Sequence, residues 1–213
     1  MRTARAIAAS LALLAAARGA EDPGAVLEPG AGLGDWRPLL EALASKGAVV
    51  APFTEHRYFP FRREPTVLRG VLRLSPERGL SLQYTEPEPC VVIADQAGLV
   101  LRDRHGRVRE LPSGSRDSGA IASLVPIMRF DLASLYPRFV IHARRLGPDW
   151  SLLFTPRDPA AAHALGEILV RGSGSDVRRI EFRRSASQRV EIDVGDARTG
   201  GVFGADELRR FFR

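Results

Sequence analysis

Few residues in this sequence have types and spacings that could do chemistry. Four histidines lie in separate segments, and none stands at metal-ligand spacing from a second candidate ligand: His56, His105, His142 and His163. Asp193 and Asp196 could act as a general acid and a general base, but carboxylates that flank a hairpin glycine more often stabilise the turn. The chain has no Gly-x-Ser-x-Gly, His-Glu-x-x-His or P-loop motif, and no Gly-x-Gly-x-x-Gly after a strand. We therefore expect no catalytic residue, no metal and no cofactor. A secreted hydrolase is the least supported of the three functions considered in this section.

The chain has one cysteine, Cys90, in the apolar run "CVVIAD". A single cysteine forms no internal disulfide, and in this context we expect it to pack as a small apolar residue rather than to act as a nucleophile.

The first twenty residues are typical of a secretory signal peptide. Arg2 and Arg5 precede a short apolar run, which ends in small residues that predict cleavage after Ala17 or Ala20. No cysteine follows the run, so we expect no lipid anchor and a destination in the periplasm or outside the cell. We expect residues 21–34 to form a flexible Gly/Pro-rich lead and residues 35–213 to form a single domain.

Part of the positive charge of the chain belongs to its expected signal peptide. The formal net charge is +6, and removal of Arg2, Arg5 and Arg18 leaves 28 basic against 25 acidic residues, a net charge of +3. The arginines are spread along the chain without interleaved aromatics, so we expect no nucleic-acid partner, although weak attraction to an anionic membrane stays open.

The elements that must position any site are mostly strands. Residues 35–45 predict one amphipathic helix with Asp35 as its N-cap. Alternation of apolar and polar residues then predicts strands near 49–59, 66–75, 79–86, 90–94, 98–104 and 107–111, and later near 139–147, 150–157, 167–172, 177–184 and 188–195. Residues 158–166 predict a turn or two of helix, and 205–213 a closing short helix. Short connections favour an antiparallel meander.

The segment Pro112–Phe139 interrupts this sheet with two short helical patterns. The first carries Ile121, Leu124, Val125 and Met128, and the second begins at a predicted Asp131 cap and carries Leu132, Leu135 and Tyr136. A long insertion between strands is where a lid is expected. The sequence therefore predicts an α+β fold, mainly antiparallel β, with about eleven strands that curl or close and a helical insertion near the middle.

One face of the sheet is apolar. Its rows include Leu72, Leu74, Leu82, Tyr84, Leu99 and Leu101. Two interpretations follow from periodicity alone: an ordinary core covered by helices, which is the commoner case, or a cavity under a movable lid.

The order of these parts resembles the LolA family of periplasmic outer-membrane lipoprotein carriers. The similar segments are "FTEHRYFPFRREPTVLRGVLRLSPERGLSLQYTEPEP", "VIADQAGLVLRDRHGRV", "IASLVPIMRFDLASLYPRFVIHARRLGPDWSLLFTPRD" and "VEIDVGDARTGGVF", roughly residues 53–203. The resemblance implies an unclosed, or half, β-barrel of about eleven strands, with a helical lid over a hydrophobic cavity that shields acyl chains. It assigns the cavity wall to Leu72, Leu74, Leu82, Tyr84, Leu99, Leu101 and Phe154, and the lid contacts to Leu124, Ile127, Met128, Leu132 and Leu135.

The chain departs from the family at one position. Where the well-studied carriers have an arginine that hydrogen-bonds the closed lid, just before the turn proline, this chain has Ser75 before Pro76. The cargo implied by the resemblance is therefore either an acylated lipoprotein or a glycolipid or other acylated lipid. The partners implied are an inner-membrane exporter and an outer-membrane acceptor, with the carrier itself a monomer.

The alternative is a sensor or adaptor of the same fold that binds a membrane-protein partner. Its motivation is an arginine-rich strand face, around Arg69, Arg73, Arg102, Arg104 and Arg183, although solvated strand faces are the commoner explanation.

Overall fold

The computed structural model describes residues 23–111 and 123–213. The expected signal peptide and cleavage sites, Ile121 and the first part of the insertion lie outside these residues. None of the helices within the described ranges has the length and apolar character needed to cross a membrane.

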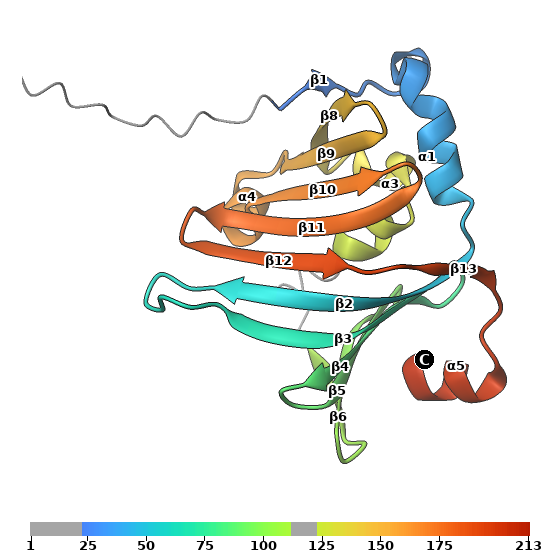
Figure 1. The fold of residues 1–213 in the computed structure, drawn as a ribbon, viewed down its shortest axis with the longest axis vertical. Coiled ribbons are helices and arrows are strands. Elements are labelled where there is room, and N and C mark those ends of the chain that lie inside the picture. Colours follow the sequence, from blue (N-terminus) through green and yellow to red (C-terminus); the bar gives the residue numbers. More distant parts are fainter. Residues whose placement is uncertain (1–22, 112–122) are drawn as a thin grey trace, which may run out of the picture.

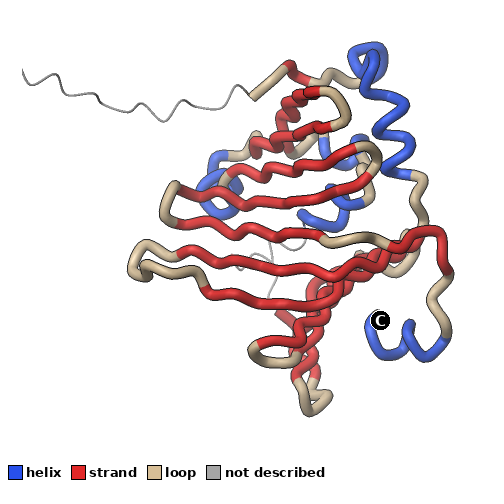
Figure 2. Tube along the Cα trace, viewed as in Figure 1, coloured by secondary structure: helices blue, strands red, loops and turns tan. Residues whose placement is uncertain are grey.

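Within the described residues, thirteen strands form one antiparallel sheet (Figures 1 and 2). The strands are β1 (Ala25–Val26), β2 (Ala48–Tyr58), β3 (Thr66–Ser75), β4 (Gly79–Glu86), β5 (Cys90–Asp95), β6 (Gly98–Asp103), β7 (Val108–Leu111), β8 (Phe139–Leu146), β9 (Asp149–Pro156), β10 (Glu167–Ser173), β11 (Asp176–Ser185), β12 (Gln188–Val194) and β13 (Arg198–Gly201). The helices with printed bounds are a 3-10 helix, η1 (Gly30–Trp36), and α1 (Arg37–Ala44), α3 (Leu132–Leu135), α4 (Pro159–Leu165) and α5 (Ala205–Phe211). Residues 123–128 are also helical.

The sheet is strongly curled but unclosed. Its order runs β1-β8-β9-β10-β11-β12-β2-β3-β4-β5-β6-β7, with β13 paired to β2 off this path, so β1 and β7 end it as unpaired edges. The expected antiparallel, unclosed architecture is confirmed. The two strands beyond the expected eleven are β1 and β13, which are too short, or in β13 too glycine-rich, to show a period of two.

The insertion between β7 and β8 covers the concave side of the sheet. Residues 123–138, called the lid below, lie behind the strands in the view of Figure 1, and α1 runs along one end of the curled sheet. Leu40 and Leu43 of α1 join the same buried cluster as the inner faces of the strands. The concave side therefore has three apolar walls: sheet, lid and α1.

The helix α5 lies on the opposite, convex face. Phe203, Phe211 and Phe212 form a second buried cluster there, packed against Val50 and Val91. The guanidinium of Arg73 lies 3.6 Å from the ring centre of Phe211, a cation–π contact.

One local expectation near the N-terminus, the Asp35 cap, was wrong. The segment expected to be a flexible lead, whose mobility stays a prediction, contains β1, which pairs with β8, and Leu27, which is buried and whose backbone N–H donates to the carbonyl of Ile141 (2.8 Å). Asp35 does not cap the helix: it lies inside η1, which is kinked at Gly34 (φ 43°), and α1 begins at Arg37 without a side-chain cap. The strand that pairs with β1 is the distant β8, and a distant partner leaves no local sequence signal.

Candidate functional site

The candidate wall residues share the inner face of the sheet. Register places Leu72 opposite Leu82, Leu82 opposite Val92, and Val92 opposite Leu101, so that one row of side chains crosses four strands. Of the candidate wall residues, those buried in the main core are Leu72, Leu74, Leu82, Tyr84, Leu99 and Phe154. Leu101 is only partly buried and packs against this core.

The lid is closed onto this face. Leu124, Ile127, Met128 and Leu135 are buried in the same cluster, and Leu132 packs against it from a half-buried position. Asp131 caps α3 as expected, because its carboxylate accepts hydrogen bonds from the backbone N–H (3.3 Å) and hydroxyl (2.6 Å) of Ser134. Contact of either residue set with an acyl chain stays a prediction.

Two residues of the lid fix it to the sheet. The Nη2 of Arg129 donates to the backbone carbonyl of Ser75 (2.9 Å), the position where the resemblance expects an arginine. The next residue, Phe130, has a φ of 51° and packs edge-on against Trp150, with the ring centres 6.1 Å apart. The donor of the lid-to-sheet hydrogen bond therefore comes from the lid and not from the strand.

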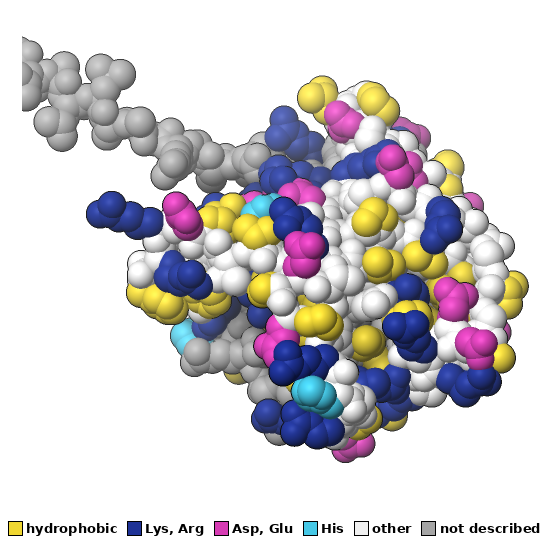
Figure 3. All heavy atoms as spheres, turned by 60° about the horizontal axis from the view of Figure 1, so that its bottom comes forward, with side chains coloured by type: hydrophobic (Ala, Val, Ile, Leu, Met, Phe, Trp, Pro, Cys, Tyr) yellow, Lys and Arg dark blue, Asp and Glu magenta, His cyan; other side chains and the backbone are white. Residues whose placement is uncertain are grey.

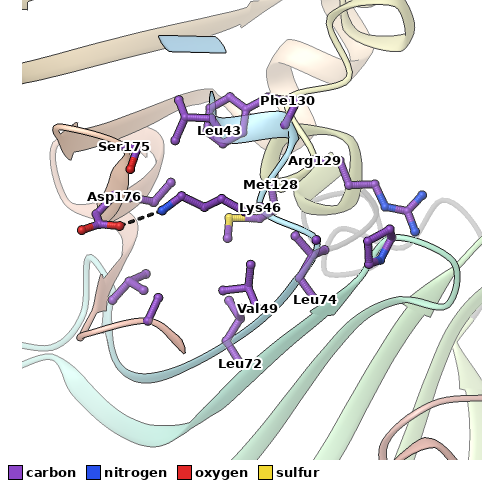
Figure 4. Close-up of a pocket in the computed structure, with 16 residues that line it drawn as sticks. Leu43, Lys46, Val49, Leu72, Leu74, Met128, Arg129, Phe130, Ser175 and Asp176 are labelled. Carbon is purple, nitrogen blue, oxygen red and sulfur yellow. Dashed lines mark hydrogen bonds and ion pairs between the residues drawn. The ribbon is translucent and has the colours of Figure 1, made fainter. Parts of the chain in front are cut away.

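A cavity of about 160 Å³ lies where lid, α1 and sheet meet (Figure 4). Its apolar walls include Leu43, Val49, Leu72, Leu74, Met128 and Phe130. At its rim Lys46, the only lysine in the chain, donates to Asp176 (2.7 Å). This hydrogen bond and the positive charge of Lys46 lower the pKa of Asp176. The cavity thus has an apolar interior and one charged pair at its edge.

The volume limits what the closed state can hold. If a methylene group takes roughly the 30 Å³ of a water molecule, about 160 Å³ accommodates about five of them. A longer acyl chain needs the buried lid side chains to move away from the sheet.

Comparison with known protein families gives a match over most of this chain. The family model described as "Outer membrane lipoprotein carrier protein LolA-like" matches residues 31–203. The chain belongs to this LolA-like family. Among curated proteins, none matches its sequence.

Several solved structures are similar to this LolA-like chain. A LolA superfamily protein from Nitrosomonas europaea aligns with a TM-score of 0.44 at 9% identity, covering 81% of this chain and 96% of that one. A putative outer membrane lipoprotein-sorting protein domain from Vibrio parahaemolyticus aligns with a TM-score of 0.46 at 8% identity, covering 82% of this chain and 94% of that one. MucB, in a complex with MucA(peri), gives 0.40 at 15% identity, covering 82% of this chain and 58% of MucB.

The inner face of this LolA-like chain also holds a buried polar cluster that sequence reasoning missed. The carboxylate of Glu55 accepts a hydrogen bond from the Tyr84 hydroxyl (2.7 Å) and is paired with the guanidinium of Arg57. Burial and the negative charge of Glu55 both raise the pKa of Tyr84, so the phenol stays protonated. The sequence signal for this cluster was the alternation in β2. Val49, Ala51 and Phe53 face inward, and the same alternation places Glu55 on the inner face.

The residues with potential chemistry do not assemble. Within 23–111 and 123–213, no group of three or more His, Cys, Asp and Glu is arranged to hold a metal. Asp193 accepts from Arg179 (2.6 Å) and Asp196 from Arg178 (2.9 Å), so the two carboxylates serve different ion pairs. Cys90 packs against the core, and burial raises the pKa of its thiol.

The arginine-rich strand face is largely engaged within the chain. Arg69 pairs with Glu86 (2.8 Å), Arg183 pairs with Glu181 (2.6 Å), and Arg102 donates to the carbonyl of Arg210 in α5 (2.5 Å). Arg73 packs on α5, as described above, and Arg104 donates to the His105 ring (3.0 Å). Figure 3 accordingly shows acidic and basic side chains interspersed over the face in view.

Proposed function

We propose that this protein is a periplasmic carrier that binds the acyl chains of a lipoprotein or lipid under its lid and ferries them toward the outer membrane. Membership in the LolA-like lipoprotein carrier family supports the carrier role. The observation that carries the proposal is the apolar cavity between the lid, α1 and the sheet, where strands including β2 and β3 supply the sheet wall.

The physical demands on such a carrier fit a small cavity under a lid. Burial of one methylene group is worth about 0.8 kcal/mol, so a long acyl chain needs continuous shielding between membranes. A cavity that is already large in the free protein would expose apolar surface to water. Here five apolar lid side chains are buried against the sheet and α1, and the cargo replaces them as the lid opens.

We propose that the residues predicted from the sequence to contact acyl chains do so in this arrangement. Leu72, Leu74 and Met128 line the cavity, and the other buried wall and lid residues form the surfaces that separate when the lid opens. The proposed partners are an inner-membrane exporter that loads the cargo and an outer-membrane acceptor that takes it. We propose that the protein acts as a monomer after removal of its signal peptide, and that it is not an enzyme.

The adaptor alternative has less support. The arginines that motivated it are engaged by carboxylates, by α5 or by a neighbouring histidine, so fewer of them are available to a partner protein.

The test is transfer of a fluorescent fatty acid from donor to acceptor vesicles. A carrier raises the transfer rate in proportion to its concentration, whereas an adaptor leaves the rate at its spontaneous value. Met128→Asp places a charge in the cavity and should abolish transfer while the circular dichroism spectrum keeps its strand signal. Val202→Asp, at a 96% exposed position, is the matched control and should transfer like the wild type. A rate independent of protein concentration would contradict the proposal.

A further inference from the structure

A second cavity adjoins the first at the lid. It has a volume of about 170 Å³ and lies between the lid, the β3–β4 turn and the β5–β6 turn. Six of its nine lining residues are polar or charged: Glu77, Arg78, Asp95, Gln96, Arg129 and Arg138. Arg129 lines both cavities, and Figure 4 shows its guanidinium directed away from the apolar one. An apolar and a polar cavity thus share one wall residue.

The guanidinium of Arg129 is incompletely satisfied. Its Nη2 donates to the carbonyl of Ser75, but its Nε is buried and has no hydrogen-bond acceptor within the part of the chain that the structure describes. A buried donor without an acceptor is costly, and a guanidinium fork is shaped to hold a carboxylate or a phosphate. The unmet donor therefore points to an acceptor supplied by a ligand.

The acidic groups nearby do not satisfy this requirement. The carboxylate of Asp95 accepts from the Nε (2.7 Å) and Nη2 (2.5 Å) of Arg213. Arg138 donates to the Ser123 hydroxyl (3.4 Å), and neither Arg129 nor Arg138 has a carboxylate partner among the described residues. Of the lining carboxylates, Glu77 remains, and it is exposed to solvent.

We propose that the polar cavity binds the anionic headgroup, a phosphate or a carboxylate, of an amphiphile whose acyl chain enters the adjacent apolar cavity. The Arg129 guanidinium lies beside the headgroup, its Nε gains an acceptor as the lid moves to admit the chain, and Arg138 adds a second positive charge. The inference rests on the proposed carrier function and narrows its cargo to acylated molecules with a negative charge next to the chain. It also gives the lid a direct contact with the cargo, because Arg129 belongs to the lid.

The experiment measures binding of amphiphiles that share a dodecyl chain, by titration calorimetry below their critical micelle concentrations. Dodecyl phosphate and dodecanoate carry the anionic headgroups, dodecyl maltoside is the neutral probe, and inorganic phosphate is the headgroup without a chain. The wild type should bind the anionic probes roughly tenfold more tightly than the maltoside, and inorganic phosphate much more weakly than dodecyl phosphate. Arg129→Gln and Arg138→Gln should each reduce this preference while maltoside binding stays unchanged. Arg63→Gln, at an exposed site in the β2–β3 turn, is the matched control and should keep the preference.

Three results would overturn the headgroup site. If Arg129→Gln lost equal affinity for the anionic and the neutral probes, Arg129 would only fasten the lid to the sheet, and the carrier proposal would be unaffected. Binding of inorganic phosphate as tight as that of dodecyl phosphate would mean a site for free anions. A wild type that binds none of the dodecyl probes would overturn the carrier proposal together with the headgroup site.

Discussion

Filling the cavity should stabilise the free protein and weaken its binding of acyl chains. Val49, which is 8% exposed, projects from β2 into the cavity, and a Val49→Phe substitution keeps a residue type that strands favour (Figure 4). A cavity costs about 24 cal/mol per Å³, so an empty volume of about 160 Å³ corresponds to about 4 kcal/mol.

The magnitudes follow from the volume that the ring fills. If the added ring occupies a third of the cavity, it should stabilise the protein by about 1.3 kcal/mol, which for a domain of this size raises the Tm by about 3 to 5 °C. The same third would hold about two methylene groups, worth about 1.6 kcal/mol, so affinity for a fluorescent fatty acid should fall roughly fifteenfold.

The assay pairs thermal unfolding with a fluorescence titration of each variant. Val67→Phe adds the same ring on the convex face, at a 38% exposed position of β3, and should change neither quantity. A Val49→Phe protein that binds the fatty acid as tightly as the wild type would refute the assignment of this cavity to acyl chains. A fall in Tm would instead show that the site is already close-packed.

Three further changes test the elements around the cavity. Tyr84→Phe removes the hydrogen bond to the buried Glu55 and should cost about 1–3 kcal/mol in urea unfolding; an unchanged midpoint would mean that the bond adds nothing to stability. Because Lys46 lowers the pKa of Asp176, the pair stabilises the fold above the ordinary carboxyl pKa of about 4, and the gain is lost as the pH falls through the lowered value. Asp176→Asn should therefore be less stable than the wild type at pH 7, and the two Tm values should converge toward pH 3; a constant difference would contradict the linkage. Phe211→Ala should cost about 3 kcal/mol by removing the anchor of α5, and a loss within 0.5 kcal/mol, roughly that of a surface change, would show that α5 is not docked.

The alternation of side chains predicted the inner face of the sheet well. Because successive side chains point to opposite faces, correct strand assignments for β3 and β4 place Leu72 with Leu74 and Leu82 with Tyr84, and the short turn between the strands sets the register that brings the two pairs together. The Asp131 cap was similarly predictable, because an N-cap acts within one turn of its own helix.

The rest depends on contacts between distant segments. β1 and β13 exist through pairing with β8 and β2, and no local pattern encodes such partners. Glu55 broke the apolar pattern of β2 and was therefore not assigned to the inner face. Arg129 had no distinguishing signal at all, since its role arises only when the lid lies against Ser75.

The most direct test of the carrier account is native mass spectrometry of the protein isolated from its source cells, followed by release and identification of anything bound. The account predicts a fraction of molecules that carry an acylated species, and the headgroup site predicts that the species is anionic. A mass without any bound species, together with no uptake of an added fatty-acyl probe, would contradict the account and favour the adaptor.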